Sequence, residues 1–365
     1  MKLAWFAAAC CIPIALTAAC SSSSTSGASG GGDGGPSGGS SGASSSGGGA
    51  ASSGGSSGGV GCGGGAVVTL ATGQANVGGI AANGTYVAFT TTDKPESNLA
   101  GAGNIMAVPA AGGTPVALAT NVDQGGLLTM DGTNVYWAGP DTGYGIIYKA
   151  PITGGDGGAD SLVNNLVDLP IDVALDSTNV YWVGDTTIQK APIAGGAKTI
   201  LAKGQNLAGV LQQPCVAVNA SGVYASTAKS ILSVPLAGGT PTTIASNQNP
   251  NAITADATNV YWTNLGQGGG VATTVVPAVM KVAATGGTPV TLVALGATAI
   301  PAFIAVDSTS VYWIEAEGCV REVPIAGGSP VALADAPLLP GGIAVDATSV
   351  YWTDTTGGKV YKTAK

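Results

Sequence analysis

Histidine is absent from this chain of 365 residues, and charged residues make up only 9% of it. Without an imidazole side chain, the protein cannot form a Ser-His-Asp or Cys-His nucleophile system, a histidine-ligated zinc site or a histidine general base. The 12 lysines and arginines are outnumbered by 20 aspartates and glutamates, and they form no basic cluster. The sequence therefore argues against nucleic acids and anionic lipid surfaces as partners.

Aromatic residues are also scarce, at 5%, whereas glycine reaches 60 residues. No segment shows the 3.6-residue apolar period of an amphipathic helix. No apolar run in the chain, the N-terminal one included, is long enough to span a bilayer. This composition is typical of short strands joined by glycine-rich turns, so we expect an all-β fold.

Residues 1–19 have the features of a secretory signal peptide. Lys2 precedes an apolar run over residues 3–16 that is too short to cross a bilayer. The sequence Leu-Thr-Ala-Ala-Cys at 16–20 resembles a bacterial lipobox, and this resemblance implies a lipoprotein acylated at Cys20. An ordinary secretory signal, with Cys20 unmodified, is the alternative. We expect a protein of the cell envelope that a lipid anchor alone attaches to the outer membrane or the cell surface.

Residues 20–61 form a low-complexity segment made almost wholly of serine, glycine and alanine. Because the segment has no apolar side chains to bury, it cannot compensate for the entropy lost on ordering, and we expect a disordered tether. A Gly/Ser chain of about forty residues has an r.m.s. span of roughly 35 Å. The tether would hold the folded domain, residues 62–365, away from the membrane.

Residues 343–354 read as a strand, a four-residue turn and a second strand, and near-copies recur from about residue 80 onward. The mean spacing of about 44 residues is the period of a four-stranded propeller blade. An aspartate that opens such a turn accepts hydrogen bonds from backbone N–H groups two and three residues on, so we interpret it as a turn former rather than a metal ligand. The seven residues that open the turns are Asn83, Asp131, Asp176, Asn219, Asp256, Asp307 and Asp346.

Four short strands are expected in each repeat. The first strand has alanine or threonine at its middle position, and the second carries a Tyr-Trp pair in five repeats, as at 351–352. Because adjacent residues of a strand point to opposite faces, each sheet would present its tyrosine to one neighbour and its tryptophan to the other. The third strand closes with a Gly-Gly pair, which is typical of a hairpin. The fourth carries a proline, so it should lie at the outer edge of its sheet.

The two ends of the repeat region indicate a closed ring. The last repeat stops at residues 360–362, inside its third strand, whereas residues 64–71 read as a fourth strand without a repeat of its own. An N-terminal strand would therefore complete the last blade. Since an open array would leave both halves as exposed edges, the sequence predicts a closed seven-bladed β-propeller of four-stranded blades.

The repeat core resembles the YWTD-type β-propeller repeat of lipoprotein receptors. The residues at 351–354 are Tyr-Trp-Thr-Asp and match all four letters, and those at 261–264, Tyr-Trp-Thr-Asn, match three. The resemblance covers residues 64–365 and implies the propeller fold, although that family has six blades where this chain has seven repeats. It says little about function.

Three cysteines lie beyond Cys20: Cys62, Cys215 and Cys319. An odd number leaves at least one outside any disulfide within the chain. Cys215 and Cys319 belong to the fourth and sixth repeats, which are not neighbours, and Cys62 lies at the boundary of the tether. We therefore do not expect an intramolecular disulfide.

The most plausible recognition surface is the face that carries the loops between second and third strands, at the mouth of the central channel. The longest of these loops span residues 90–104 and 264–278. Calcium bound by acidic residues of this face is one interpretation, but solvated loop charges are favoured and no cofactor is expected. The candidate residues are Asp93, Glu96, Asp141, Tyr144, Asp185, Glu315, Glu317 and Arg321.

Two functions are consistent with these features. The first is a monomeric, surface-tethered, non-enzymatic module that binds or scaffolds a protein or glycan partner. The alternative is a propeller enzyme, such as a lactonase-like hydrolase that uses a carboxylate-bound divalent metal. Three or four convergent Asp, Glu or Asn side chains at the channel mouth would favour the enzyme. We favour the binding module, because histidine is absent and the turn aspartates already have a structural role.

Overall fold

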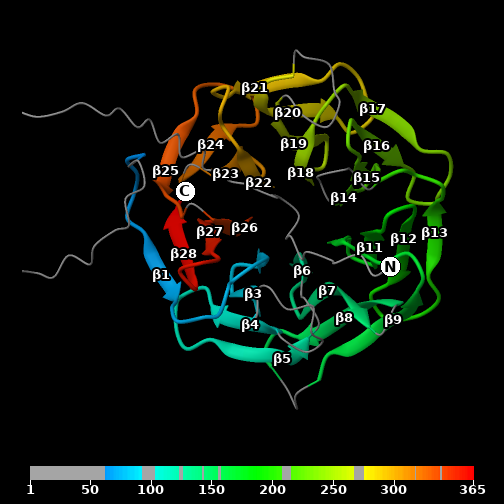
Figure 1. Cartoon of the computed structure of the whole chain (residues 1–365), viewed down its shortest axis with the longest axis horizontal. Helices are drawn as coiled ribbons and strands as arrows, with labels where there is room; N and C mark the ends of the chain where they lie inside the picture. Colours follow the sequence, from blue (N-terminus) through cyan, green and yellow to red (C-terminus); the bar gives the residue numbers. More distant parts are fainter. Residues whose placement is uncertain are drawn as a thin grey trace, which may run out of the picture. The chain divides into compact units, whose positions relative to one another are not determined.

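The computed structural model describes residues 62–92, 103–122, 126–141, 144–154, 158–207, 215–266, 275–316, 318–337 and 339–365. Within these ranges the chain forms seven four-stranded antiparallel sheets and no helix. The sheets are arranged as blades around a common centre (Figure 1). The predicted all-β, seven-bladed propeller is confirmed. The described ranges accordingly hold no apolar helix long enough to cross a membrane.

Each blade consists of four consecutive strands, except the last. The strands of blades 1 to 3 are β2 (Ile80–Ala82), β3 (Tyr86–Thr92), β4 (Gly103–Pro109) and β5 (Val116–Val122); β6 (Leu128–Met130), β7 (Asn134–Asp141), β8 (Tyr144–Pro151) and β9 (Asp160–Leu166); and β10 (Asp172–Leu175), β11 (Asn179–Val183), β12 (Ile188–Pro192) and β13 (Thr199–Ala202). Those of blades 4 to 6 are β14 (Val216–Asn219), β15 (Gly222–Ser226), β16 (Ser230–Val234) and β17 (Thr242–Ser246); β18 (Pro250–Ala255), β19 (Asn259–Leu265), β20 (Pro277–Ala283) and β21 (Val290–Ala294); and β22 (Pro301–Val306), β23 (Ser310–Glu315), β24 (Cys319–Pro324) and β25 (Val331–Asp335).

Blade 7 is built from both ends of the repeat region. Its strands are β26 (Pro340–Val345), β27 (Ser349–Asp354), β28 (Lys359–Ala364) and β1 (Val68–Ala71). β1 is antiparallel to β28, with Val68 opposite Lys362, and the two strands lie side by side at the rim (Figure 1). The predicted closure by an N-terminal strand is confirmed, and no blade edge is left open at the junction.

The Tyr-Trp pairs form the core between blades, as their alternation predicts. At the blade 5–6 boundary, Tyr261 packs in one cluster with Trp313, and at the next boundary Tyr312 packs with Trp352. Each tyrosine thus faces the following blade and each tryptophan the preceding one. In blade 1, Phe89 occupies the tryptophan register opposite Ile80. All of these rings are almost fully buried, which accounts for their recurrence as packing.

The turn aspartates form the predicted hydrogen bonds and one more. Oδ1 of Asp256 accepts hydrogen bonds from the backbone N–H groups of Thr258 and Asn259, at 2.7 and 2.6 Å. Its Oδ2 accepts a hydrogen bond from the hydroxyl of Tyr261, at 2.6 Å. Burial alone would raise the pKa of Asp256, but these hydrogen bonds outweigh it and lower the pKa. The sequence pattern did not reveal that the turn aspartate also anchors the core tyrosine.

The outer strand of every blade contains a β-bulge that the sequence did not predict. In blade 3, Ile188 lies opposite Ala202 and Gln189 opposite Ile200, so that Leu201 is passed over in the pairing. Leu201 and Ala202 are consequently both buried although they are adjacent, while Ile200 is 43% exposed. The prolines also lie differently from the expectation. They precede the strand, since β5, β21 and β25 begin one residue after Pro115, Pro289 and Pro330.

Candidate functional site

The first strands of all seven blades surround a central cavity of about 360 Å³. Small side chains at their middle positions, such as Ala81, Ala174 and Ala344, leave this space open. The last residues of the same strands, including Leu175 and Val345, form an apolar, partly exposed collar around one end of the cavity. Only a few polar side chains are among the residues that line it.

Asp172 is the only carboxylate among the described residues that line this cavity. It is the first residue of β10 and only 5% exposed. Its Oδ1 accepts a hydrogen bond from the backbone N–H of Val173, and its Oδ2 accepts one from Val216 in blade 4, both at 2.8 Å. Burial raises the pKa of Asp172 to about 7, against the lowering effect of these two bonds. No sequence feature separates Asp172 from the strand residues around it, and we did not predict it.

Carboxylates also gather on the face where second and third strands are joined, which we call the loop face. In blade 3, Oδ1 of Asp168 accepts a hydrogen bond from the backbone N–H of Asp185, at 2.9 Å. The hydroxyl of Thr187 donates to Oδ2 of Asp168, at 2.6 Å. The Asp185 side chain is exposed, and its partial burial together with the charge of Asp168 raises its pKa. The structure thus places the predicted residue Asp185 beside a second carboxylate, that of Asp168, which was not among the candidate residues.

Tyr144 lies on the same face, in the neighbouring blade 2. It is the first residue of β8 and is 49% exposed. Gly145 pairs with Leu166 in the antiparallel ladder of β8 and β9. The next residue of the outer strand, Val167, therefore lies opposite Tyr144, and it is 84% exposed. Asp168 is the next residue along the chain. The loop face therefore presents an aromatic and an aliphatic side chain on blade 2, followed in the chain by the carboxylates of blade 3.

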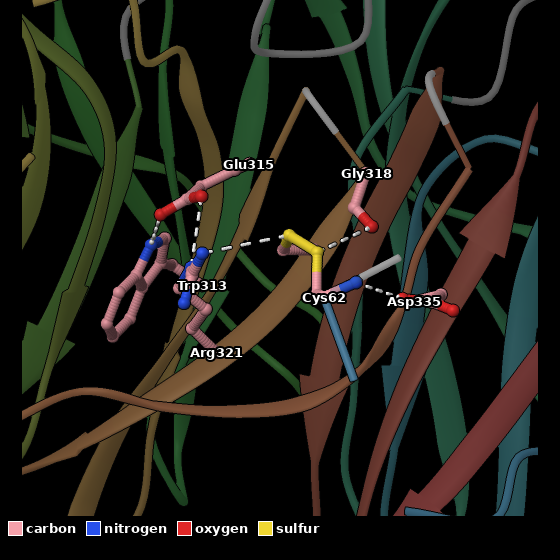
Figure 2. Close-up of a disulfide and its surroundings, with 7 residues drawn as sticks. Cys62, Trp313, Glu315, Gly318, Arg321 and Asp335 are labelled. Carbon is pink, nitrogen blue, oxygen red and sulfur yellow. Dashed lines mark hydrogen bonds and ion pairs between the residues drawn. A yellow bond between two sulfur atoms is a disulfide. The ribbon is translucent and has the colours of Figure 1, made fainter. Parts of the chain in front are cut away.

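Glu315 and Arg321 form a partly buried cluster instead of an open surface. Nε of Arg321 lies 3.0 Å from Oε2 of Glu315, and Nε1 of Trp313 donates to Oε1 of Glu315, at 3.1 Å (Figure 2). Glu315 is only 8% exposed. The expectation that Glu315 offers an accessible carboxylate to a partner therefore needs correction, because both of its oxygens have partners within blade 6.

This cluster is specific to blade 6. The indole N–H groups of Trp137, Trp182 and Trp352 have no hydrogen-bond acceptor among the residues that the structure describes. A buried donor without an acceptor costs free energy, so Glu315 stabilises blade 6 in a way that these blades lack. The sequence signal for this cluster is the Trp-x-Glu spacing in the second strand, where the sequence alone favours solvated charges.

The cysteines give a second correction, since Cys62 and Cys319 form a disulfide with a Cα–Cα distance of 5.9 Å (Figure 2). Residues 62–65 lie along the edge of blade 6: the backbone N–H of Cys62 donates to Asp335, and that of Gly65 donates to Leu333. The expectation of no intramolecular disulfide was wrong because it assigned Cys62, at the boundary of the tether, to no blade, whereas the structure places it against blade 6. Cys215 is buried, and its thiol donates to the carbonyl of Asn251.

Several predicted residues cannot be placed. Cys20, Asp93, Glu96 and Glu317 lie outside the described residues, and so does the side chain of Asp141. Their roles remain predictions. Within the described ranges, no three His, Cys, Asp or Glu side chains are grouped so that they could hold a metal ion.

Comparison with known proteins identifies the fold and no family. No protein-family model and no curated protein matches the chain. Similar solved structures include the WD40 β-propeller domain of Doa1, with a TM-score of 0.59, 12% identity, and coverage of 82% of this chain and 96% of that one. YCF48 bound to D1 peptide has a TM-score of 0.56 and 9% identity, over 82% of this chain and 96% of that one.

A third similar structure is the extracellular domain of a hybrid two component system from B. thetaiotaomicron. Its TM-score is 0.59 at 10% identity, and the match covers 81% of this chain but 39% of that one. At these identities the likeness concerns the propeller architecture alone, which hosts many unrelated functions.

Proposed function

We propose that the protein is a non-enzymatic binding or scaffolding module of the cell envelope, tethered through a lipid on Cys20, whose loop face engages a protein or glycan partner. The observation that carries the proposal is the surface formed by Tyr144, Val167, Asp168 and Asp185, which we call the blade 2–3 patch. It combines exposed apolar side chains with carboxylates on one face of the ring.

The chemistry of this patch suits recognition. A half-exposed tyrosine offers a rigid apolar ring and a hydrogen-bonding hydroxyl at little cost in side-chain entropy, which is why tyrosine is enriched at binding surfaces. Asp168 is fixed by hydrogen bonds from Asp185 and Thr187, so part of the patch is preorganised. One propeller of similar fold, YCF48, is bound to D1 peptide.

The test compares two variants of the full chain in binding to envelope proteins and to a glycan array. Tyr144→Ala combined with Asp185→Asn removes the aromatic ring and one carboxylate of the patch, and we expect at least a tenfold loss of affinity for whichever partner the wild type binds. Val290→Ala changes a residue that is 48% exposed on the outer edge of blade 5 and should leave binding unchanged. Equal binding by both variants would contradict the proposed surface.

The lipid anchor is tested separately. The Cys20→Ser variant should move from the membrane fraction to the soluble fraction and lose incorporation of a labelled fatty acid. A variant that stays in the membrane fraction would remove the lipoprotein part of the proposal and leave the binding surface untouched.

A calcium and magnesium titration followed by thermal melting distinguishes the binding module from a metal-dependent hydrolase. A clear rise in the melting temperature would reveal a carboxylate site and favour the hydrolase or a calcium-ordered binder. The proposed metal-free module predicts no shift.

A further inference from the structure

Asp172 departs from the pattern that the other six blades follow at the same register. Asp172 directly precedes Val173, and Val173 pairs with Trp182 of the second strand. The corresponding residue in each other blade precedes the residue that pairs with the tryptophan position of its second strand. None of the six corresponding residues is charged, so the fold builds this strand six times without a carboxylate. These residues are Gly79, Leu127, Cys215, Ala252, Phe303 and Gly342.

The charge of Asp172 is not balanced within the described part of the protein. Its hydrogen bonds come from two backbone N–H groups, those of Val173 and Val216, and neither donor carries a charge. Each carboxylate oxygen has capacity for a further hydrogen bond. A buried ionised carboxylate is costly unless it is paired with a cation. The raised pKa reflects the same cost. The cavity that Asp172 lines has room for the missing partner.

We infer that the central cavity binds an ammonium or guanidinium group carried on an unbranched apolar stem, with Asp172 as its counter-ion. The strand from Asp172 to Leu175 advances roughly 10 Å, which leaves length for an extended six-carbon stem beside it. The cation would lie against the carboxylate, and the stem would extend past Ala174 toward the apolar collar. A cavity of about 360 Å³ falls within the range that binds small ligands.

This site is separate from the blade 2–3 patch, because it lies in the cavity and not on the exposed face. The same cationic group could come from a free amine or from a lysine or arginine side chain of a partner. The two sources share the chemistry and differ in size, so they can be compared directly.

The experiment is isothermal titration calorimetry of the full chain at pH 8 with hexylammonium and, as a neutral analogue of the same length, hexan-1-ol. We expect hexylammonium to bind at least tenfold more tightly than hexan-1-ol. Asp172→Asn should abolish that preference, whereas Asp160→Asn, which removes an exposed carboxylate on the outer strand of blade 2, should preserve it. Equal affinity for the two compounds in the wild type, or a preference that survives in Asp172→Asn, would overturn the inference.

Two additions keep the test decisive. If Asp172→Asn does not fold, Ala174→Leu narrows the cavity and retains the carboxylate, and it should remove hexylammonium binding; unchanged binding would place the ligand elsewhere and refute the site.

A capped Gly-Gly-Lys-Gly-Gly peptide then identifies the source of the cation. Tighter binding of the peptide than of hexylammonium indicates a partner side chain, and weaker binding indicates a free amine.

Discussion

At the scale of single residues, one carboxylate in each of five blades connects a turn to the core. Asp256 holds two backbone N–H groups with one oxygen and the Tyr261 hydroxyl with the other. In blade 4, asparagine replaces aspartate, and Oδ1 of Asn219 must serve both the turn and Tyr224. The Asn219 amide is thereby directed to the carbonyl of Asp256 in the next blade, at 2.7 Å. Aspartate and asparagine at this position therefore both accept hydrogen bonds from the turn and from the core tyrosine.

Substitution of Asp256 should separate these contributions. Asp256→Ala leaves the two turn N–H groups and the buried Tyr261 hydroxyl without their acceptor, and we expect the free energy of unfolding to fall by about 2–3 kcal/mol. Asp256→Asn copies blade 4 and should cost about 1 kcal/mol. Urea unfolding measures both. Asparagine keeps the Oδ1 acceptor and alanine removes it. Equal losses of stability in the two variants would therefore show that the hydrogen bonds to Oδ1 do not stabilise the turn.

Asp172 predicts an unusual pH dependence of stability. Its pKa is about 7 in the folded protein and 3.8 as its ordinary value, so between about pH 4 and 7 the folded protein holds a proton that the unfolded chain has released. The unfolded chain binds fewer protons there, and the contribution of this group therefore falls as pH rises, by roughly 4 kcal/mol across the window. The groups that contact the carboxyl are the uncharged N–H groups of Val173 and Val216.

The measurement compares urea unfolding of the wild type and Asp172→Asn at several pH values from 4.5 to 8. Taking the difference between the two proteins removes the contributions of all other groups, including the turn aspartates, whose lowered pKa values act below pH 4. The stability of the wild type relative to the variant should decrease toward pH 8. A constant difference would show that Asp172 remains ionised throughout.

At the scale of elements, the bulge in the outer strand explains how two adjacent residues enter the same core. Leu201 and Ala202 are 3% and 5% exposed, whereas a regular strand would place these two neighbours on opposite faces. Ile200, directly before them, is 43% exposed. We expect Leu201→Ala to lower the free energy of unfolding by about 2–4 kcal/mol and Ile200→Ala to change it by less than about 0.5 kcal/mol. Urea midpoints decide this, and a larger loss for Ile200→Ala would show that the bulge is misplaced.

The sequence predicted what depends on local chemistry. The turn aspartates, the Gly-Gly pairs and the Tyr-Trp alternation each act over a few residues, so their repetition predicted the number of blades and that the tyrosine and tryptophan of a blade face opposite neighbours. Which neighbour each ring faces came from the structure, where Tyr261 packs with Trp313. The bulge escaped prediction because it arises from the pairing of two strands and leaves no residue signature. The glycine pairs, in contrast, correctly indicated turns. Gly112 and Gly113 both adopt positive φ, at 96° and 150°, a conformation that favours glycine.

The candidate site was less predictable because it depends on which distant segments meet. Tyr144 and Asp185 were named from their position in loops, and the structure places both on one face. Glu315 was also named, but only the structure shows its oxygens committed to Trp313 and Arg321. Asp172 lies in an apolar strand, where a sequence gives no reason to expect a buried charge.

At the scale of the whole molecule, both ends of the repeat region fasten blade 7 to blade 6. Cys62, upstream of β1, is bonded to Cys319 of blade 6. Lys365, which follows β28, pairs with Asp307 of blade 6 at 2.5 Å and also donates to the carbonyl of Asp346. The chain between Cys62 and Cys319 contains β1 of blade 7, all of blades 1 to 5 and the first strands of blade 6. The disulfide closes this segment into a covalent loop.

Reduction of this disulfide should lower stability substantially. The bond joins residues 257 positions apart. For a loop of that size, the chain-entropy relation gives about 5.5 kcal/mol at 25 °C as an upper value. We expect the urea midpoint to fall on addition of a reductant, and the Cys62→Ser variant to unfold at the lower midpoint with or without reductant. Cys215→Ser serves as the control that retains the sensitivity. An unchanged midpoint on reduction would mean that non-covalent contacts alone determine closure.

The position of the disulfide predicts more than this entropic effect. In the oxidised protein, release of β1 from β28 still leaves blade 1 joined to blade 6 through residues 62–79, so the interface where Tyr351 packs with Phe89 stays closed. After reduction, the same release lets blades 7 and 1 separate. Native-state hydrogen exchange should therefore show at least a tenfold loss of protection in β1, β28 and β3, with a smaller change in β15 and β16 on blade 4. A uniform loss around the ring would instead indicate that the bond acts only by restricting the unfolded chain.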